Sequence, residues 1–362
     1  MTTSQPTTQP GAQPGATQPG AQRDATQVGG PRLAPPTPDE LAQASEILHR
    51  VTTAFSARVV GQQRLRSALL IALISEGHVL LESVPGLAKT LAASTLSQTV
   101  NAHFSRIQCT PDLLPSDIIG TQVYDPRNHV FETQLGPVHA NFVLLDEINR
   151  SSAKTQSAML EAMQERQTSI AGQVHPLPRP FMVLATQNPI EEEGTYLLPH
   201  AQMDRFLLKE VVTYPSDAEE LVVLDRIEAG TLGPDHEATS PVASPEDVVT
   251  LQELAKRVYV DPAIKRYMVA LVQASRDTPR LLGPQLGSYV EIGASPRASI
   301  AFLQAARATA LLQGRNYVTP DDVRDLRHSV LRHRLHLSFE ALAERVQPEM
   351  LVDALVRAVP SP

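Results

Sequence analysis

The stretch from Leu80 to Thr90, which reads LLESVPGLAKT, decides the fold of this chain. It begins as an apolar strand, passes through a loop that holds Pro85 and Gly86, and reaches Lys89 and Thr90 where a helix begins. Such a loop directs backbone N–H groups and the positive end of a helix dipole into one concavity, which favours a polyphosphate. In this interpretation Lys89 reaches the β- and γ-phosphates, and the Thr90 hydroxyl binds Mg²⁺.

The motif G-x-x-x-x-G-K-[ST] is matched only in part, because Ser83 stands at the first glycine and Ala88 at the second. Taken alone, the stretch is equally compatible with an ordinary strand-turn-helix that carries a solvated lysine. If the backbone at Ser83 required a positive φ, strain there would cost about 1–2 kcal/mol and weaken nucleotide affinity by about tenfold. Ala88 is expected to be the milder change. The rest of the chain must decide between the two interpretations.

Length, charge and cysteine content limit the possible classes. The chain has 362 residues, enough for two domains, and a net charge of -8, which argues against a surface devoted to nucleic acid. The single cysteine, Cys109, excludes an intramolecular disulfide and is expected to be a small buried hydrophobe. No apolar run approaches the roughly 18 residues that span a bilayer, and the N-terminus lacks a basic region followed by an apolar one. We therefore expect a cytoplasmic protein.

Composition divides the chain into four segments. Residues 1–37 are rich in proline and glycine and are predicted to be a disordered tail. Residues 38–230 alternate short apolar runs with helical stretches, which is typical of an α/β core with a parallel sheet covered by helices. Residues 231–243 have the composition of a linker. Residues 244–362 carry apolar residues at helical spacing, which predicts an all-helical domain.

Elements can be placed within these segments. Strands are predicted at residues 79–81, 105–108, 142–145 and 181–186, with a helix at 153–166. Segments 124–138 and 168–177 carry turn residues between apolar flanks and are expected to be inserted hairpins. Helix starts are marked where Thr or Ser precedes Pro, at Thr37, Ser244, Ser295 and Thr319.

Two adjacent carboxylates, Asp146 and Glu147, end the apolar strand that begins at Phe142. Placing two acids there is costly unless they bind a cation or act on water. Beside a phosphate loop, Asp146 would hold Mg²⁺ through its water shell and Glu147 would polarise the water that attacks the γ-phosphate. The alternative, that both acids cap a strand end at the surface, loses weight because the loop and the acids require each other.

Asn188 follows the strand predicted at 181–186. The carboxyl ends of parallel strands meet at one edge of a sheet, where open α/β sheets bind their ligands. Asn188 is therefore a candidate to contact the γ-phosphate or to orient the attacking water. Asparagine before proline is also ordinary turn chemistry, and the local sequence does not choose between the two roles.

From about Val59 to the C-terminal helices, the chain resembles the MoxR family of AAA+ ATPases. The matching stretches are VVGQQ at 59, HVLLESVPGLAKT at 78, TPDLLPSDIIGT at 110, GPVHANFVLLDEINRSSAKTQSAMLEAMQERQ at 136, VLATQNPIEEEGTYLLPHAQMDRF at 183 and GASPRA at 293. The resemblance implies an AAA+ P-loop core followed by a helical lid, with ATP and Mg²⁺ as cofactors.

The resemblance also implies roles for individual residues. Those implied for catalysis are Glu147 of the Walker B pair, Asn188 as sensor 1, Arg205 as an arginine finger offered to a neighbouring subunit, and Arg297 as sensor 2. Those implied for nucleotide binding are Val59, Val60, Gln62, Val84, Pro85, Gly86, Leu87, Ala88, Lys89, Thr90, Leu91 and Asp146, of which Thr90 and Asp146 would hold Mg²⁺.

At the level of function, the resemblance implies a homo-oligomeric ring, expected to be a hexamer, with both hairpins facing its central pore. Such a ring would act as a chaperone that remodels, assembles or promotes metal loading of a partner with a von Willebrand factor A domain. Two alternatives stay open: a nucleic-acid-dependent motor, and an ATP-binding scaffold with very slow turnover, for which Ser83 is the local sign. The acidic balance and the absence of a basic, aromatic-interleaved stretch on either hairpin disfavour the motor.

Overall fold

The computed structural model describes residues 1, 34–84, 86–188, 198–231 and 240–362. Most of the tail predicted at 1–37, and residues 232–239 of the predicted linker, lie outside the described residues. The chain forms two units, Met1–Ala34 and Pro35–Pro362, and the helices and strands of the described residues lie in the second. No helix among the described residues is long and apolar enough to cross a membrane.

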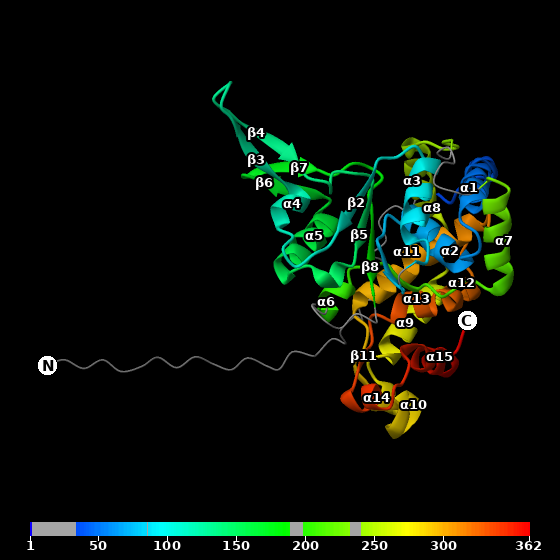
Figure 1. Cartoon of the computed structure of the whole chain (residues 1–362). Coiled ribbons are helices and arrows are strands. Elements are labelled where there is room, and N and C mark those ends of the chain that lie inside the picture. The colour runs from blue at the N-terminus through cyan, green and yellow to red at the C-terminus, as the bar shows by residue number, and fades with distance from the viewer. Residues whose placement is uncertain (2–33, 85, 189–197, 232–239) are drawn as a thin grey trace. The chain divides into compact units, whose positions relative to one another are not determined.

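A five-stranded parallel sheet with the order β2-β5-β8-β1-β9 forms the centre of this unit (Figure 1). Its strands are β1 (Val79–Glu82), β2 (Phe104–Gln108), β5 (Phe142–Asp146), β8 (Met182–Gln187) and β9 (Leu208–Val211). The four strands expected from the sequence are confirmed within two residues at each end. The edge strand β9 was not predicted, because its apolar residues follow Phe206 without a turn signal.

The two faces of the sheet are both apolar, as a parallel sheet covered on both sides requires. Leu81, Leu144 and Leu184 belong to one core cluster, together with α1 (Pro38–Arg58), α2 (Gln63–Ile74) and α3 (Lys89–Thr99). Leu80 and Val143 belong to a second cluster with α4 (Pro115–Ile119) and α5 (Ala153–Glu165). Neighbouring residues of each strand point to opposite faces of the sheet, so the two clusters lie on opposite faces. Helices therefore cover both faces of the sheet.

Both predicted hairpins are confirmed. One consists of β3 (Gly120–Asp125) and β4 (Val130–Leu135), the other of β6 (Gln167–Ile170) and β7 (Gln173–Pro176). The β3–β4 hairpin extends away from the central sheet (Figure 1) and exposes the side chains of Val123, Tyr124, Val130, Phe131 and Leu135.

The C-terminal part of the chain is helical, as predicted. Its helices are α8 (Pro245–Arg257), α9 (Pro262–Ala274), α10 (Thr278–Gly287), α11 (Pro296–Leu312), α12 (Pro320–Asp325), α13 (Arg327–Leu331), α14 (Phe339–Ala343) and α15 (Pro348–Ala358). A short antiparallel pair, β10 (Val290–Ile292) and β11 (His336–Leu337), is added to them. The expected N-caps Thr37, Ser244, Ser295 and Thr319 each accept a hydrogen bond from their helix.

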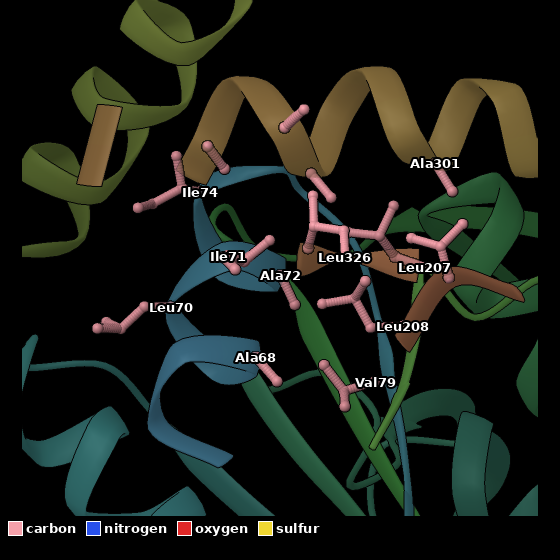
Figure 2. Close-up of a cluster of buried hydrophobic side chains, with 14 of the residues drawn as sticks. Ala68, Leu70, Ile71, Ala72, Ile74, Val79, Leu207, Leu208, Ala301 and Leu326 are labelled. Atoms are coloured by element: carbon pink, nitrogen blue, oxygen red, sulfur yellow. The ribbon is translucent and has the colours of Figure 1, made fainter. Parts of the chain in front are cut away.

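The hydrophobic core does not divide at the predicted linker. The cluster that contains Leu81 also contains buried residues of α8, α9 and α11. Figure 2 shows part of it, with side chains of α2, β1 and β9 gathered in one cluster with Ala301 of α11. Residues 244–362 are thus packed directly on the helices that cover the sheet.

Two short elements complete the fold between β8 and α8. Helix α6 (His200–Met203) precedes β9, and α7 (Asp217–Glu228) follows it. No residue of α7 is buried, and Leu221, Leu224 and Ile227 are exposed. The side chain of Arg226 joins α7 to the end of α1 by donating to the backbone oxygens of Ser56 and Ala57, at 3.2 and 2.7 Å.

Candidate active site

The loop between β1 and α3 places Lys89 and Thr90 in the first turn of a helix, as predicted. Ala88 is the N-cap of α3 and has a φ of 52°, and Gly86 has a φ of 85°. Lys89 Nζ lies 3.5 Å from the backbone oxygen of Val84, whose side chain packs partly buried against the core. Pro85 lies outside the described residues. The described part of the loop therefore has the strand-loop-helix form that suits a phosphate group.

The position of backbone strain in this loop differs from the expectation. Ser83 is not among the described residues with positive φ; its N–H donates to the backbone oxygen of Gln187 at 3.1 Å, which extends the β1–β8 pairing. Ala88, expected to be the milder change, takes the left-handed conformation instead. The backbone strain that comes from a non-glycine residue in this loop is thus found at Ala88, the residue directly before the lysine.

Thr186 on the neighbouring strand β8 binds both acidic residues at the end of β5, Asp146 through its carboxylate and Glu147 through its backbone N–H. The Thr186 hydroxyl donates to Oδ1 of Asp146 at 2.8 Å, and its oxygen accepts the backbone N–H of Glu147 at 2.8 Å. Glu147 has a φ of 58°, a conformation that non-glycine residues adopt at a cost. One hydroxyl therefore orients the Asp146 carboxylate and binds the backbone at Glu147, a role that the sequence did not reveal.

Two further polar side chains reach the acids from β2. Arg106 donates to Oδ2 of Asp146 from Nη2 at 2.6 Å and from Nε at 3.2 Å, and Gln108 donates to Oε2 of Glu147 at 2.9 Å. Arg106 and Gln108 are two residues apart on a strand and so share one face, and Gln108 pairs in register with Asp146. Arg150 adds a contact of 3.2 Å between its Nε and Oε2 of Glu147.

The loop and the two acidic residues line one cavity of about 310 Å³. It is lined by Gly86, Leu87, Ala88, Lys89, Thr90, Leu91, Arg106, Gln108, Asp146, Glu147 and Asn188. Asn188 is buried, directly after β8. Nine residues of the sequence-based set thus meet in one place, whereas Arg106 and Gln108 were missed. Their only signal was a pair of polar residues at alternate positions near the end of a predicted strand.

Three residues implied for nucleotide binding, Val59, Val60 and Gln62, lie at the junction of α1 and α2. Val59 is buried in the core, and Gln62 has a φ of 52° as the N-cap of α2. Gln62 lines a second cavity of about 370 Å³ with Tyr214 and Glu219, and its Nε2 donates to the backbone oxygen of Thr213 at 3.0 Å. Val60, the residue after Val59, is half-buried.

The two candidate arginines do not line the cavity around Lys89 and Asp146. Arg205 and Arg297 instead line a separate cavity of about 290 Å³ with Asp204, Arg166 and Arg334. Nη1 of Arg297 lies 3.7 Å from Oδ2 of Asp204. Glu147 and Asn188 thus line one cavity, whereas Arg205, expected to serve a neighbouring subunit, lies outside it, and so does Arg297.

Cys109, just beyond β2, is buried, and its backbone N–H donates to the oxygen of Asp146 at 2.9 Å. Burial raises the pKa of its thiol to about 12. A thiol that stays protonated is neither a nucleophile nor a metal ligand, so Cys109 acts as a small hydrophobic residue, as expected.

The fold and this cavity define an AAA-type ATPase. Residues 78–208 match the model of the ATPase family associated with various cellular activities, and residues 287–355 match an AAA lid domain. The chain is 48% identical to "Chaperone MoxR1" of Mycobacterium tuberculosis, over 91% of this chain and 86% of that protein. It is 31% identical to "Protein MoxR" of Methylorubrum extorquens, over 84% of this chain and 92% of that protein.

A solved structure from Cytophaga hutchinsonii has a similar fold. Its TM-score is 0.83 and its sequence identity 40%, with 89% of this chain and 97% of that chain covered. The chain belongs to the MoxR family of AAA+ ATPases. The resemblance found in the sequence motifs is thereby confirmed.

Proposed function

We propose that this chain hydrolyses ATP with Mg²⁺ in the cavity that Lys89, Asp146 and Glu147 line. The observation that carries the proposal is the meeting of a helix N-terminus, the Lys89 ammonium and two carboxylates at one cavity of about 310 Å³. Backbone N–H groups of Gly86 to Lys89 and the ammonium of Lys89 would bind the phosphates. Glu147 would accept a proton from the attacking water, and Asn188 would orient that water or contact the γ-phosphate.

The chemistry of the donor set fits Mg²⁺. Asp146 and Thr90 offer hard oxygen ligands, and both line the cavity. No group of three His, Cys, Asp or Glu side chains among the described residues could hold a metal ion by itself. This suits Mg²⁺, which protein sites commonly hold through one or two side chains together with substrate phosphates and water. When bound, Mg²⁺ would neutralise charge that develops on the phosphate oxygens.

We further propose that Arg205 acts on the nucleotide of a neighbouring subunit in a homo-oligomeric ring, which we expect to be a hexamer, and that Arg297 is sensor 2. Support for the role of Arg205 comes from its separation from the cavity that Lys89 and Asp146 of its own chain line. Phosphoryl transfer in such enzymes gains about 10³ to 10⁵ in rate from a cation on the transferred group. A ring supplies that cation from the next subunit.

The test is a mixing experiment. Arg205→Ala should keep its affinity for ATP and lose turnover, and Lys89→Ala should lose ATP binding. Mixing the two should restore partial turnover, because a mixed ring contains interfaces with an intact loop on one side and an intact arginine on the other. If the mixture stays inactive while rings form, or if Arg205→Ala alone turns over normally, the shared site is wrong.

As to its task, we propose a chaperone that remodels, assembles or promotes metal loading of a partner protein with a von Willebrand factor A domain. The family and the relative named "Chaperone MoxR1" support a chaperone. The partner class rests on the family resemblance alone. Steady-state ATP turnover separates the candidates: stimulation by a von Willebrand A-domain protein supports the chaperone, stimulation by DNA the motor, and turnover near zero under all conditions the ATP-binding scaffold.

A further inference from the structure

One side chain, Arg334, holds the backbone on both sides of Arg205. Its Nη2 donates to the backbone oxygens of Asp204 and Phe206 at 3.3 and 2.6 Å, and its Nη1 donates to that of Leu207 at 3.2 Å. Its Nε donates to Oδ1 of Asp204 at 2.8 Å. All three nitrogens of the planar guanidinium, Nε, Nη1 and Nη2, therefore donate hydrogen bonds to the segment that carries Arg205.

Arg334 reaches this segment from far along the chain. It follows α13, and the hydrogen bond to Asp204 spans 130 residues. Its side chain is 2% exposed, and burial lowers the pKa of the guanidinium to about 10, partly offset by the charge of Asp204. A buried charged pair is a weak source of stability, because desolvation offsets most of the attraction. The placement therefore calls for a role beyond joining two parts of the fold.

Besides Arg334, two further residues of the helical region contact Asp204. Ser295, the N-cap of α11, donates to Oδ2 of Asp204 at 2.7 Å, and Arg297 lies near the same oxygen. Arg205 itself is held less directly. Its backbone N–H donates to Gln202, and its buried Nε has no hydrogen-bond partner among the described residues. The direction in which the Arg205 side chain leaves the backbone thus depends on the hydrogen bonds from Arg334 to the residues on both sides of Arg205.

We propose that Arg334 is a positioning residue for Arg205. It fixes the backbone from Asp204 to Leu207 and so sets where the Arg205 guanidinium meets the phosphates of a neighbouring subunit. The helical region thereby determines the rate at a site that lies in another chain. This inference rests on the proposed function, in which Arg205 acts across a subunit interface. A displacement of about 1 Å of a catalytic group can cost about 10²-fold in rate, which sets the size of the effect.

The chain offers a matched control two residues away. Arg332 is also buried, at 8% exposed, and pairs with Glu349 of α15 at 3.0 Å. If Arg334 only stabilised the fold, Arg332→Lys and Arg334→Lys would act alike. Both variants retain the charge and lose the planar fork, so both should lower the melting temperature.

The experiment compares Arg334→Lys with Arg332→Lys in full-length chains. Arg334→Lys should bind ATP within about twofold of the unmodified protein and turn it over about 10- to 100-fold more slowly. Arg332→Lys should keep normal turnover. Mixing Arg334→Lys chains with Lys89→Ala chains, whose Arg334 and Arg205 are intact, should restore turnover, as is expected for Arg205→Ala chains. Mixing Arg334→Lys chains with Arg205→Ala chains should not restore it, because both chains then lack a well-placed arginine.

Two results would overturn the inference alone. One is turnover by Arg334→Lys as fast as by Arg332→Lys. The other is a loss that Lys89→Ala does not repair although it repairs Arg205→Ala, since the defect would then lie in the variant's own nucleotide site. If Lys89→Ala fails to repair even Arg205→Ala, the shared site itself is wrong and the inference falls with it.

A second pair of variants decides the question if Arg334→Lys does not fold. Ser295→Ala removes the hydrogen bond to Asp204 and one helix cap, whereas Ser244→Ala removes only the corresponding cap of α8. Both should lower the melting temperature, because each loses the side chain that caps a helix. Ser295→Ala should turn over ATP several-fold more slowly than Ser244→Ala, and equal turnover would overturn the proposal.

Discussion

Arg106 and Asp146 form an ion pair at the place where the proposed Mg²⁺ site lies. Arg106 donates two hydrogen bonds to Oδ2 of Asp146, whereas Oδ1 accepts a hydrogen bond from the Thr186 hydroxyl. The side chain of Arg106 is 49% exposed, and that of Asp146 is 13% exposed. Oδ2 is therefore shared between a resident guanidinium that can swing into solvent and any cation that arrives with a nucleotide.

Arg106→Gln should therefore strengthen the effect of Mg²⁺ on ATP binding. Without the guanidinium, Oδ2 is open to the hydrated cation, and a partly exposed ion pair is worth up to about 1 kcal/mol, or about fivefold. The ratio of ATP affinity in Mg²⁺ to that in EDTA, measured by calorimetry, should rise by about two- to fivefold. Arg150→Gln, which removes a charge beside Glu147 instead, serves for comparison. Weaker ATP binding by Arg106→Gln in EDTA would mean that Arg106 contacts the phosphates.

Glu147→Gln should bind ATP and fail to hydrolyse it. The substitution keeps the backbone hydrogen bond to Thr186 and leaves Asp146 in place, so only the acceptor for the water proton is lost. Turnover should fall by about 10²- to 10⁴-fold, while bound ATP is recovered intact after gel filtration. Glu161→Gln, on the exposed face of α5, is the control. Normal turnover in Glu147→Gln would place the base elsewhere.

Ala88→Gly should stabilise the protein. Relief of the left-handed strain gains about 1–2 kcal/mol and the added freedom of glycine in the unfolded chain costs about 0.5–1 kcal/mol, so the net gain should be about 0.5–1 kcal/mol. Urea unfolding measures this difference. Ser83→Gly, in the same loop without positive φ, should lower stability. A gain from Ser83→Gly rather than Ala88→Gly would restore the original expectation about the strained position.

Acid should destabilise the fold through His78. Its Nδ1 accepts the N–H of Val183 and its Nε2 lies 3.1 Å from the oxygen of Met163, so the neutral ring is bound at both nitrogens. Burial lowers the pKa of His78 from 6.5 to about 4. Only the unfolded chain gains this proton between those values, so stability is fully present above pH 6.5 and falls by about 3 kcal/mol as the pH drops to about 4.

The measurement is the urea midpoint as a function of pH. His78→Gln should flatten the dependence in that window, whatever its effect on absolute stability. His103→Gln, at an exposed position, should keep the slope of the unmodified protein. An unchanged slope in His78→Gln would show that other groups cause the loss.

The sequence alone predicted that Lys89, Thr90, Asp146 and Glu147 lie together, because they follow apolar strands at the same sheet edge. Arg106 and Gln108 could not be predicted, since their role depends on the register of β2 against β5 across about 40 residues. The same holds for Arg334, whose partner lies 130 residues earlier. Local patterns predict elements and their ends, whereas contacts between distant elements require the assembled sheet and helices.

The location of Arg297 illustrates the same limit. The motif at Ser295 predicts a helix start correctly, yet nothing in it says which part of the core that helix meets. In the folded chain the helix start meets Asp204 rather than the loop at Lys89. Likewise β9, which closes one edge of the sheet, carries no local signal that distinguishes it from a loop.

Helix α7 has a consequence for hydrogen exchange. A helix that buries no side chain, and that is joined to α1 by the guanidinium of Arg226, gains little from tertiary packing. Its amide protons should therefore exchange through local opening, orders of magnitude faster than those of α2, whose residues from Ala68 to Ile74 are all buried. Because α7 carries Glu219 on the wall of the cavity that Gln62 lines, a ligand bound there would slow exchange in α7 and leave α2 unchanged. The amides of this one helix would thus report occupancy without a label.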